Sequence, residues 1–164
     1  MPTPPKVPSS KPAPPKVQGG RGKTVLVIDG DREHRGRLVR LLREATKTAE
    51  GPAAAIHEAD DGHAAWALIE VTKPDLIVAE ILIEGISGLQ LLRRVREQFA
   101  GTDKVPSVFF VTDMSNEVDR YWALRNGAAA YVIKPYDDEF LRQRVAKVLA
   151  NEGGFELSAW GDEG

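Results

Sequence analysis

The sequence has no cysteine, no long apolar run and little net charge. The absence of cysteine among its 164 residues excludes disulfides, thiolate metal sites and cysteine nucleophiles. No apolar stretch approaches the ~20 residues that a membrane helix needs, and the N-terminus lacks the apolar segment of a signal peptide. A formal net charge of −2 argues against binding to nucleic acid through its phosphates. We therefore expect a cytoplasmic protein whose partners are neither membranes nor nucleic acids.

Proline and charge are distributed unevenly along the chain. Residues 1–22 hold seven prolines between Pro2 and Pro15, and residues 1–23 carry only basic charges. This composition predicts a disordered, basic, Pro/Gly-rich leader with some polyproline II character. Residues 152–164 carry only acidic charges and form an acidic C-terminal tail that also holds Phe155, Leu157 and Trp160. These apolar residues either pack on the domain or anchor a partner, and a single domain is expected over residues 23–151.

Apolar runs alternate with segments of helical periodicity five times between the two tails. We expect strands over residues 24–28, 54–59, 75–80, 105–111 and 129–133, and helices over residues 32–46, 61–71, 88–98, 116–126 and 136–150. Alternation of this kind predicts an α/β protein with a doubly wound parallel sheet and helices on both faces. Within the helices, Ala64 and Ala67 of the second and Phe140 of the last are expected to point inward.

Four polar residues stand where predicted strands end. Asp29 follows the first strand, Glu80 the third, Thr112 the fourth and Lys134 the fifth. Ligands of such sheets sit beyond the carboxyl ends of the strands. Two carboxylates, a hydroxyl and an ammonium are therefore expected to converge on one pocket.

Five stretches resemble the landmarks of the response-regulator receiver family. They are residues 27–31, 74–80, 85–89, 108–112 and 127–136. The resemblance covers about four-fifths of the chain, with every landmark in order. It implies a flavodoxin-like (βα)5 fold with five strands and five helices, and a Lys134–Pro135 bond that is cis. It also implies two-component phosphorelay signalling in bacteria.

The resemblance assigns a role to each position of the pocket. An aspartate at the position of Glu80 accepts a phosphoryl group, and an acid pair at positions 29 and 30 holds Mg²⁺. The positions of Thr112 and Lys134 bind phosphoryl oxygens. The aromatic at the position of Tyr131 turns inward in the active state.

Three residues of this pocket depart from the family pattern. Glu80 is one methylene longer than aspartate, and nucleophilic attack tolerates little misplacement. Gly30 removes a direct Mg²⁺ ligand, and Asp31, as the expected helix N-cap, should point elsewhere. Asp113 adds bulk and negative charge beside Thr112. We expect no enzymatic activity, no catalytic residue and no cofactor, with at most weak Mg²⁺ binding at Asp29.

Two interpretations of the retained Thr112 and Lys134 stay open. They either satisfy Glu80 and Asp29 in a fixed pocket, or they respond to Glu80 as a built-in substitute for a phosphoryl group. The resemblance implies output through the fourth helix, fifth strand and fifth helix, so we expect a partner-binding surface with Trp122, Arg125, Tyr131 and Tyr136. An exposed tryptophan is also typical of binding hot spots.

The leading hypothesis is a stand-alone pseudo-receiver that works as a signalling adaptor, largely independent of phosphorylation. We expect no output domain after residue 151, so that its effect would pass through a signalling partner. That partner would be a kinase, a GTPase regulator, or a motility or polarity factor, and the chain would be a monomer or weak dimer. The alternatives are a phosphorylatable single-domain response regulator and a small-ligand sensor using the altered acidic pocket.

Overall fold

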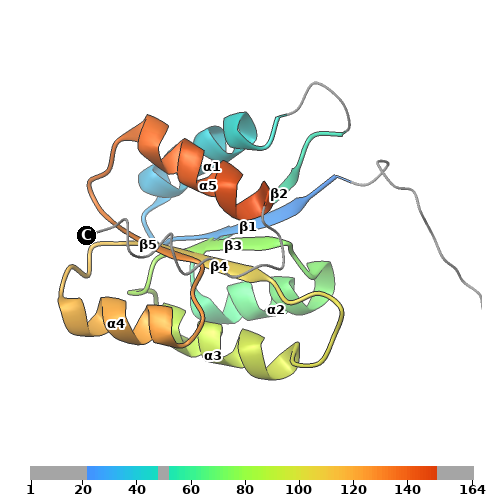
Figure 1. The fold of residues 1–164 in the computed structure, drawn as a ribbon, viewed down its shortest axis with the longest axis vertical. Helices are drawn as coiled ribbons and strands as arrows, with labels where there is room; N and C mark the ends of the chain where they lie inside the picture. Colours follow the sequence, from blue (N-terminus) through green and yellow to red (C-terminus); the bar gives the residue numbers. More distant parts are fainter. Residues whose placement is uncertain (1–21, 48–51, 151–164) are drawn as a thin grey trace, which may run out of the picture.

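The computed structural model describes residues 22–47 and 52–150, and these form one sheet with helices on both faces (Figure 1). The strands are β1 Thr24–Ile28, β2 Ala55–Ala59, β3 Leu76–Ala79, β4 Ser107–Thr112 and β5 Ala130–Ile133. The helices are α1 Arg32–Ala45, α2 Gly62–Thr72, α3 Gly88–Gln98, α4 Glu117–Arg125 and α5 Asp138–Ala150. The strand order is β2-β1-β3-β4-β5 and every pairing is parallel, so the predicted flavodoxin-like α/β fold is confirmed.

The central strands are buried on both faces, which explains their continuous apolar sequence. All four residues of β3 are buried, as are five of the six residues of β4. β2 lies at an edge of the sheet, and its more polar sequence is only partly buried. The central strands therefore carry the site residues on a rigid base.

The helices form two layers around the sheet. Figure 1 shows α1 and α5 together on one face and α2, α3 and α4 on the other. Leu38, Leu42, Leu141 and Val145 fill the first layer. The second layer is built on Ile69, Leu92, Val95, Ala123 and their neighbours. Because the connecting helices cover both faces, the edge at the carboxyl ends of the strands is left for a site.

Two local features position the strand ends. Asp31 caps α1 as expected, since its side chain accepts hydrogen bonds from the backbone N–H groups of Glu33 and His34. Gly88 lets α3 start directly against the end of β3. A Cβ at Gly88 would lie 2.7 Å from the carbonyl oxygen of Glu80, so any side chain there would displace the strand end.

Some expected details are wrong. Phe140 is 43% exposed, with the Arg144 guanidinium 5.4 Å from its ring centroid, and α5 begins at Asp138 rather than Tyr136. Ala64 and Ala67 are exposed, whereas Ala65 and Ile69 form the buried stripe of α2. Apart from Gly22, the leader lies outside the described residues, as does the acidic tail. No helix in the described part of the chain is long and apolar enough to cross a membrane.

Candidate functional site

Asp29, Glu80, Thr112 and Lys134 meet at the carboxyl edge of the sheet. Lys134 Nζ lies 3.0 Å from Glu80 Oε1 and 3.1 Å from Asp29 Oδ2. Asp29 and Glu80 are only 2% and 4% exposed, and Thr112 is fully buried. The predicted convergence is therefore present, with one ammonium between two buried carboxylates.

The side chain of Glu80 folds back onto its own strand end and onto β4. Its Oε2 accepts hydrogen bonds from the hydroxyl of Thr112, from Ile81 N at 3.0 Å and from Leu82 N at 3.1 Å. Its Oε1 faces the ammonium of Lys134 as an ion pair without regular hydrogen-bond angles. The carboxylate of Glu80 is thus surrounded by one hydroxyl, two backbone N–H groups and one ammonium of the protein.

Thr112 connects this carboxylate to the core beneath α4. Its Oγ1 accepts a hydrogen bond from Met114 N at 3.0 Å, and the Met114 carbonyl accepts one from the Tyr131 hydroxyl at 2.8 Å. The Tyr131 ring is 6% exposed and packs edge-on against Phe110. A continuous chain of contacts therefore runs from Glu80 to an inward-facing Tyr131.

A second chain of contacts leads from Asp29 toward α5 through His34, which the sequence analysis did not identify as a site residue. His34 Nδ1 lies 2.7 Å from Asp29 Oδ2, and its Nε2 lies 2.8 Å from the Tyr136 hydroxyl. A neutral ring protonated on Nδ1 can donate to the carboxylate and accept from the phenol. The position of His34 in the sequence could have indicated this role, because it lies in the first turn of α1, five residues after Asp29.

The electrostatics of the pocket favour the charged forms of its partners. Burial alone would raise the pKa of Asp29, but hydrogen bonds from His34, Asp31 N and Lys134 hold that pKa below its ordinary value. Burial alone would lower the pKa of Lys134, but its contacts with Glu80 and Asp29 raise it. Each buried charge is thus stabilised by an opposite charge.

These residues do not offer a good Mg²⁺ site. Magnesium needs oxygen ligands in near-octahedral geometry. Gly30 supplies no side-chain oxygen, and the carboxylates of Asp29 and Glu80 already face Lys134. Across residues 22–47 and 52–150, no group of three or more acidic or histidine side chains could hold a metal ion.

The remaining expected pocket residues lie at its rim. Asp31 is exposed, and only its backbone N–H reaches Asp29, at 2.8 Å from Oδ1. The carboxylate of Asp113 is 72% exposed and lies 3.8 Å from Lys134 Nζ. Gly30 borders a separate hollow of about 470 Å³ that Asp60, Asp61 and Glu84 also line. That hollow is acidic and does not include the Glu80 carboxylate.

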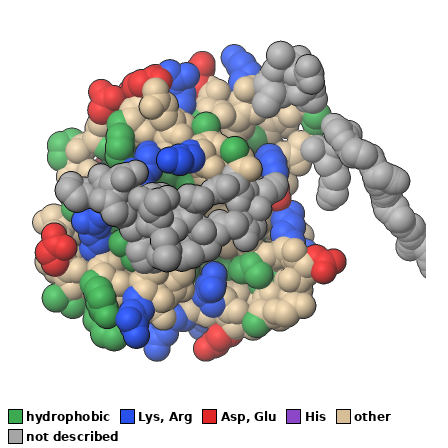
Figure 2. All heavy atoms as spheres, viewed as in Figure 1, with side chains coloured by type: hydrophobic (Ala, Val, Ile, Leu, Met, Phe, Trp, Pro, Cys, Tyr) green, Lys and Arg blue, Asp and Glu red, His purple; other side chains and the backbone are tan. Residues whose placement is uncertain are grey.

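The four residues expected to bind a partner do not form one surface. Trp122 and Arg125 lie on the exposed side of α4, where Figure 2 shows a hydrophobic patch at the lower left. Tyr131 is buried, which corrects its assignment to the surface. Tyr136 packs with the α1–α5 layer on the other side of the sheet, against His34 and beneath the Arg37 guanidinium.

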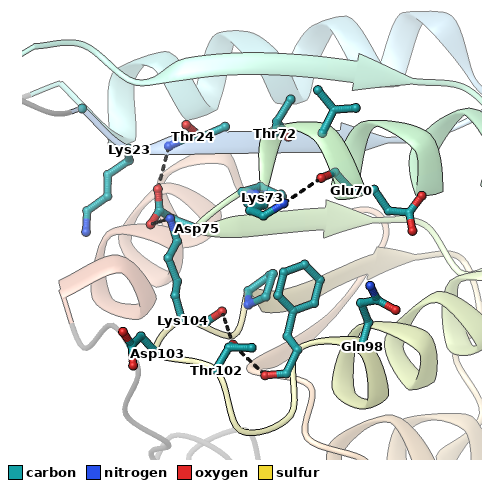
Figure 3. Close-up of a pocket in the computed structure, with 15 residues that line it drawn as sticks. Lys23, Thr24, Glu70, Thr72, Lys73, Asp75, Gln98, Thr102, Asp103 and Lys104 are labelled. Atoms are coloured by element: carbon teal, nitrogen blue, oxygen red, sulfur yellow. Dashed lines mark hydrogen bonds and ion pairs between the residues drawn. The ribbon is translucent and has the colours of Figure 1, made fainter. Parts of the chain in front are cut away.

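A larger pocket of about 1070 Å³ opens at the opposite end of the sheet (Figure 3). Two of its lysines have partners within it: Lys104 pairs with the Asp75 carboxylate at 2.9 Å, and Lys73 Nζ donates to the backbone carbonyl of Glu70 at 3.0 Å. Asp75 also accepts a hydrogen bond from Thr24 N at 2.8 Å. These contacts tie together the starts of β1, β3 and β4, which is a structural role.

The buried Tyr131 hydroxyl makes stability sensitive to high pH. Burial, with the negative charges of Asp119 and Glu80, raises its pKa to about 12. An unfolded tyrosine ionises near pH ~10. Between these values the unfolded chain loses the proton first, so the free energy of unfolding should fall as pH rises. Chemical denaturation over this range, compared with Tyr131→Phe, should show a shallower pH dependence in the variant, and equal slopes would contradict the assignment.

Comparison with known families and proteins identifies what the chain is similar to. The family model described as "Response regulator receiver domain" matches residues 25–146. Protein PilH of Pseudomonas aeruginosa is 36% identical over 93 residues, which are 57% of this chain and 75% of PilH. The transcriptional regulatory protein AfsQ1 of Streptomyces coelicolor is 32% identical over 126 residues, 77% of this chain but only 51% of AfsQ1. The chain thus spans about half the length of this second relative.

Solved structures agree on the fold. A signal receiver domain of a DNA-binding response regulator from Colwellia psychrerythraea superposes with a TM-score of 0.67 at 20% identity, covering 78% of this chain and 98% of that one. A response-regulator receiver domain from Bermanella marisrubri gives a TM-score of 0.64 at 20% identity, covering 79% and 99%.

Proposed function

Because this chain belongs to the response-regulator receiver domain family, we propose that it acts as a pseudo-receiver that controls a signalling partner by direct contact, largely without phosphorylation. The family handles signals by switching a surface, and this chain keeps the framework of that switch. It lacks the side chains that the family uses for phosphoryl transfer at positions 30 and 80.

The observation that carries the proposal is the self-contained bonding of Glu80. Its two carboxylate oxygens contact Lys134, the Thr112 hydroxyl and two backbone N–H groups, so they already occupy the donors that a phosphoryl group would use. Tyr131 is already turned inward and bonded to Met114. This arrangement supports a switch that is held in one state by its own sequence.

The outer side of α4 is the surface we assign to the partner. Val118, Tyr121, Trp122 and Arg125 recur at helical spacing opposite the buried Ala123. The rings of Tyr121 and Trp122 meet edge-on at 5.3 Å, and the Arg125 guanidinium lies 5.8 Å from the Tyr121 ring centroid. Aromatic and arginine side chains in one cluster are typical of binding hot spots.

Trp122→Ala should abolish partner capture. Removing a hot-spot tryptophan costs about 2 kcal/mol or more, which is roughly a 30-fold loss of affinity. The measurement is affinity capture from a lysate of the native cell with the full chain as bait, quantified for each recovered protein. Recovery should be unchanged when a small phosphodonor and Mg²⁺ are added.

Val71→Ala is the matched control, because Val71 is 79% exposed on α2, away from this stripe, and its replacement should leave capture intact. Capture that requires the phosphodonor would favour the phosphorylatable regulator instead. Thermal stabilisation of the isolated chain by a nucleotide or metabolite would favour the ligand sensor. Equal loss of capture by Trp122→Ala and Val71→Ala would show that α4 is not the contact surface.

A further inference from the structure

A cationic groove runs along α1 beside α5, apart from the acid pocket and from the stripe on α4. It has a volume of about 460 Å³ and lies between the exposed side of α1 and the start of α5. Its lining residues are Arg37, Arg40, Leu41, Arg43, Glu44, Lys47 and Asp138. Four of these seven side chains are basic and two are acidic, so the groove carries an excess of positive charge.

Most of this positive charge has no partner within the described residues. Arg37 is neutralised, because its guanidinium pairs with Asp138. Within residues 22–47 and 52–150, no acidic side chain forms an ion pair with Arg40, Arg43 or Lys47. The apolar side of the groove is provided by Leu41, which is only partly covered. An acidic segment that also carries apolar side chains would complement both features.

We propose that this groove binds the acidic C-terminal segment of the same chain, residues 151–164. That segment holds Glu152, Glu156, Asp162 and Glu163 and no basic residue. It also holds three large apolar side chains, Phe155, Leu157 and Trp160, which the groove would cover. The match of charge and of apolar content selects this segment, and the inference is independent of the adaptor proposal.

The path of the chain brings the segment to the groove. α1 and α5 each follow a parallel strand, so both run back along the sheet in the same direction, and they lie side by side (Figure 1). The ion pair between Arg37 and Asp138 places the start of α5 beside the second turn of α1. α5 continues for twelve residues past Asp138 to Ala150, so it ends near Lys47, just past the C-terminal end of α1.

The length of the segment is sufficient for the proposed contact. Arg37 and Lys47 are ten residues apart, most of them along α1, which corresponds to a span of about 15 Å. Five extended residues cover about 17 Å, so residues 151–155 alone reach across the groove. The eleven residues from Gly154 onward include both aromatic side chains of the segment, Phe155 and Trp160. Binding within one molecule also benefits from the high effective concentration of a short linker.

Trp160 provides a direct probe of this contact in the full chain. With Trp66→Phe and Trp122→Phe, Trp160 is the single tryptophan, and its emission and acrylamide quenching report whether the indole is covered. We expect a shielded indole at low salt. Arg40→Glu with Arg43→Glu should expose it and raise the quenching constant about two-fold or more, because an indole leaves an apolar contact for water. Salt near 1 M, where the Debye length is about 3 Å, should weaken the contact as well.

The matched control reverses two exposed charges elsewhere, Lys73→Glu with Arg93→Glu, and should leave Trp160 shielded. Adding Glu152→Lys and Glu156→Lys to the α1 reversal should restore shielding by exchanging the charges. The proposal is overturned if Trp160 is exposed in the unreversed chain, or if the α1 reversal does not release it. If shielding of Trp160 increases with protein concentration, the groove binds the segment of a second copy instead. If the control variant exposes Trp160 as much as the α1 reversal does, the groove is not the specific site.

Discussion

Replacing Lys134 by methionine is expected to lower the free energy of unfolding by about 3–5 kcal/mol, the range for breaking a buried ion pair by removing one partner. Its side chain is 15% exposed, and its ammonium lies within 3.1 Å of the carboxylates of both Asp29 and Glu80. Methionine fills a similar volume but leaves two buried carboxylates without a cation. Urea denaturation monitored by circular dichroism measures the difference.

Two controls separate charge from packing in this experiment. Lys104→Met removes the ion pair between Lys104 and Asp75. Because the Lys104 side chain is 50% exposed, this change should lower the free energy of unfolding by only about 0–1 kcal/mol. Adding Glu80→Gln to Lys134→Met removes one of the two orphaned charges and should restore part of the lost stability. The deficit of Lys134→Met should also narrow below pH ~4, where carboxylates take up protons. A deficit no larger than that of Lys104→Met would show that the pocket does not depend on its ammonium.

The fold was predictable because burial leaves a strong mark on the sequence. The runs at β1, β3 and β4 are apolar without interruption, as expected of strands covered by helices on both faces. Side-chain orientation within helices was less predictable. Phe140 precedes Val145 by five residues, which is about 140° around a helix, so both cannot face the core. In α2, alanine fits both the buried and the exposed side, so the positions of the alanines did not show which side of the helix faces the core.

The site was predictable only where position in the topology determines proximity. Asp29, Glu80, Thr112 and Lys134 follow strands that end at one edge, so their convergence follows from the parallel sheet. His34 instead reaches Asp29 through the orientation of its side chain on α1, and its spacing from other histidines carries no information. Tyr131 lies within β5 and Tyr136 three residues after the end of β5, but they enter opposite layers, a separation that depends on side-chain direction.

The same geometry predicts which substitutions would restore phosphoryl acceptance. Gly30→Asp, Glu80→Asp and Asp113→Ala together should give a chain that takes up one phosphoryl group from acetyl phosphate in the presence of Mg²⁺. An aspartate fits at position 30, because a Cβ there would meet only the carbonyl oxygen of Asp60, at an ordinary 3.6 Å. Aspartate at position 80 withdraws the carboxylate by one methylene from Thr112 and Lys134, which frees those donors. Intact-mass spectrometry after incubation detects the added group.

The single variants identify the step that each departure blocks. Gly30→Asp alone should gain Mg²⁺ binding, measured by isothermal titration calorimetry, without gaining a phosphoryl group, because attack requires an accurately placed carboxylate. Glu80→Asp alone should remain unmodified, because Gly30 still withholds a metal ligand. Chelation of Mg²⁺ should abolish modification of the triple variant. Phosphorylation of the unaltered chain at Glu80 under these conditions would instead establish it as a working phosphoacceptor, since its existing contacts with Thr112 and Lys134 would then serve the reaction rather than replace it.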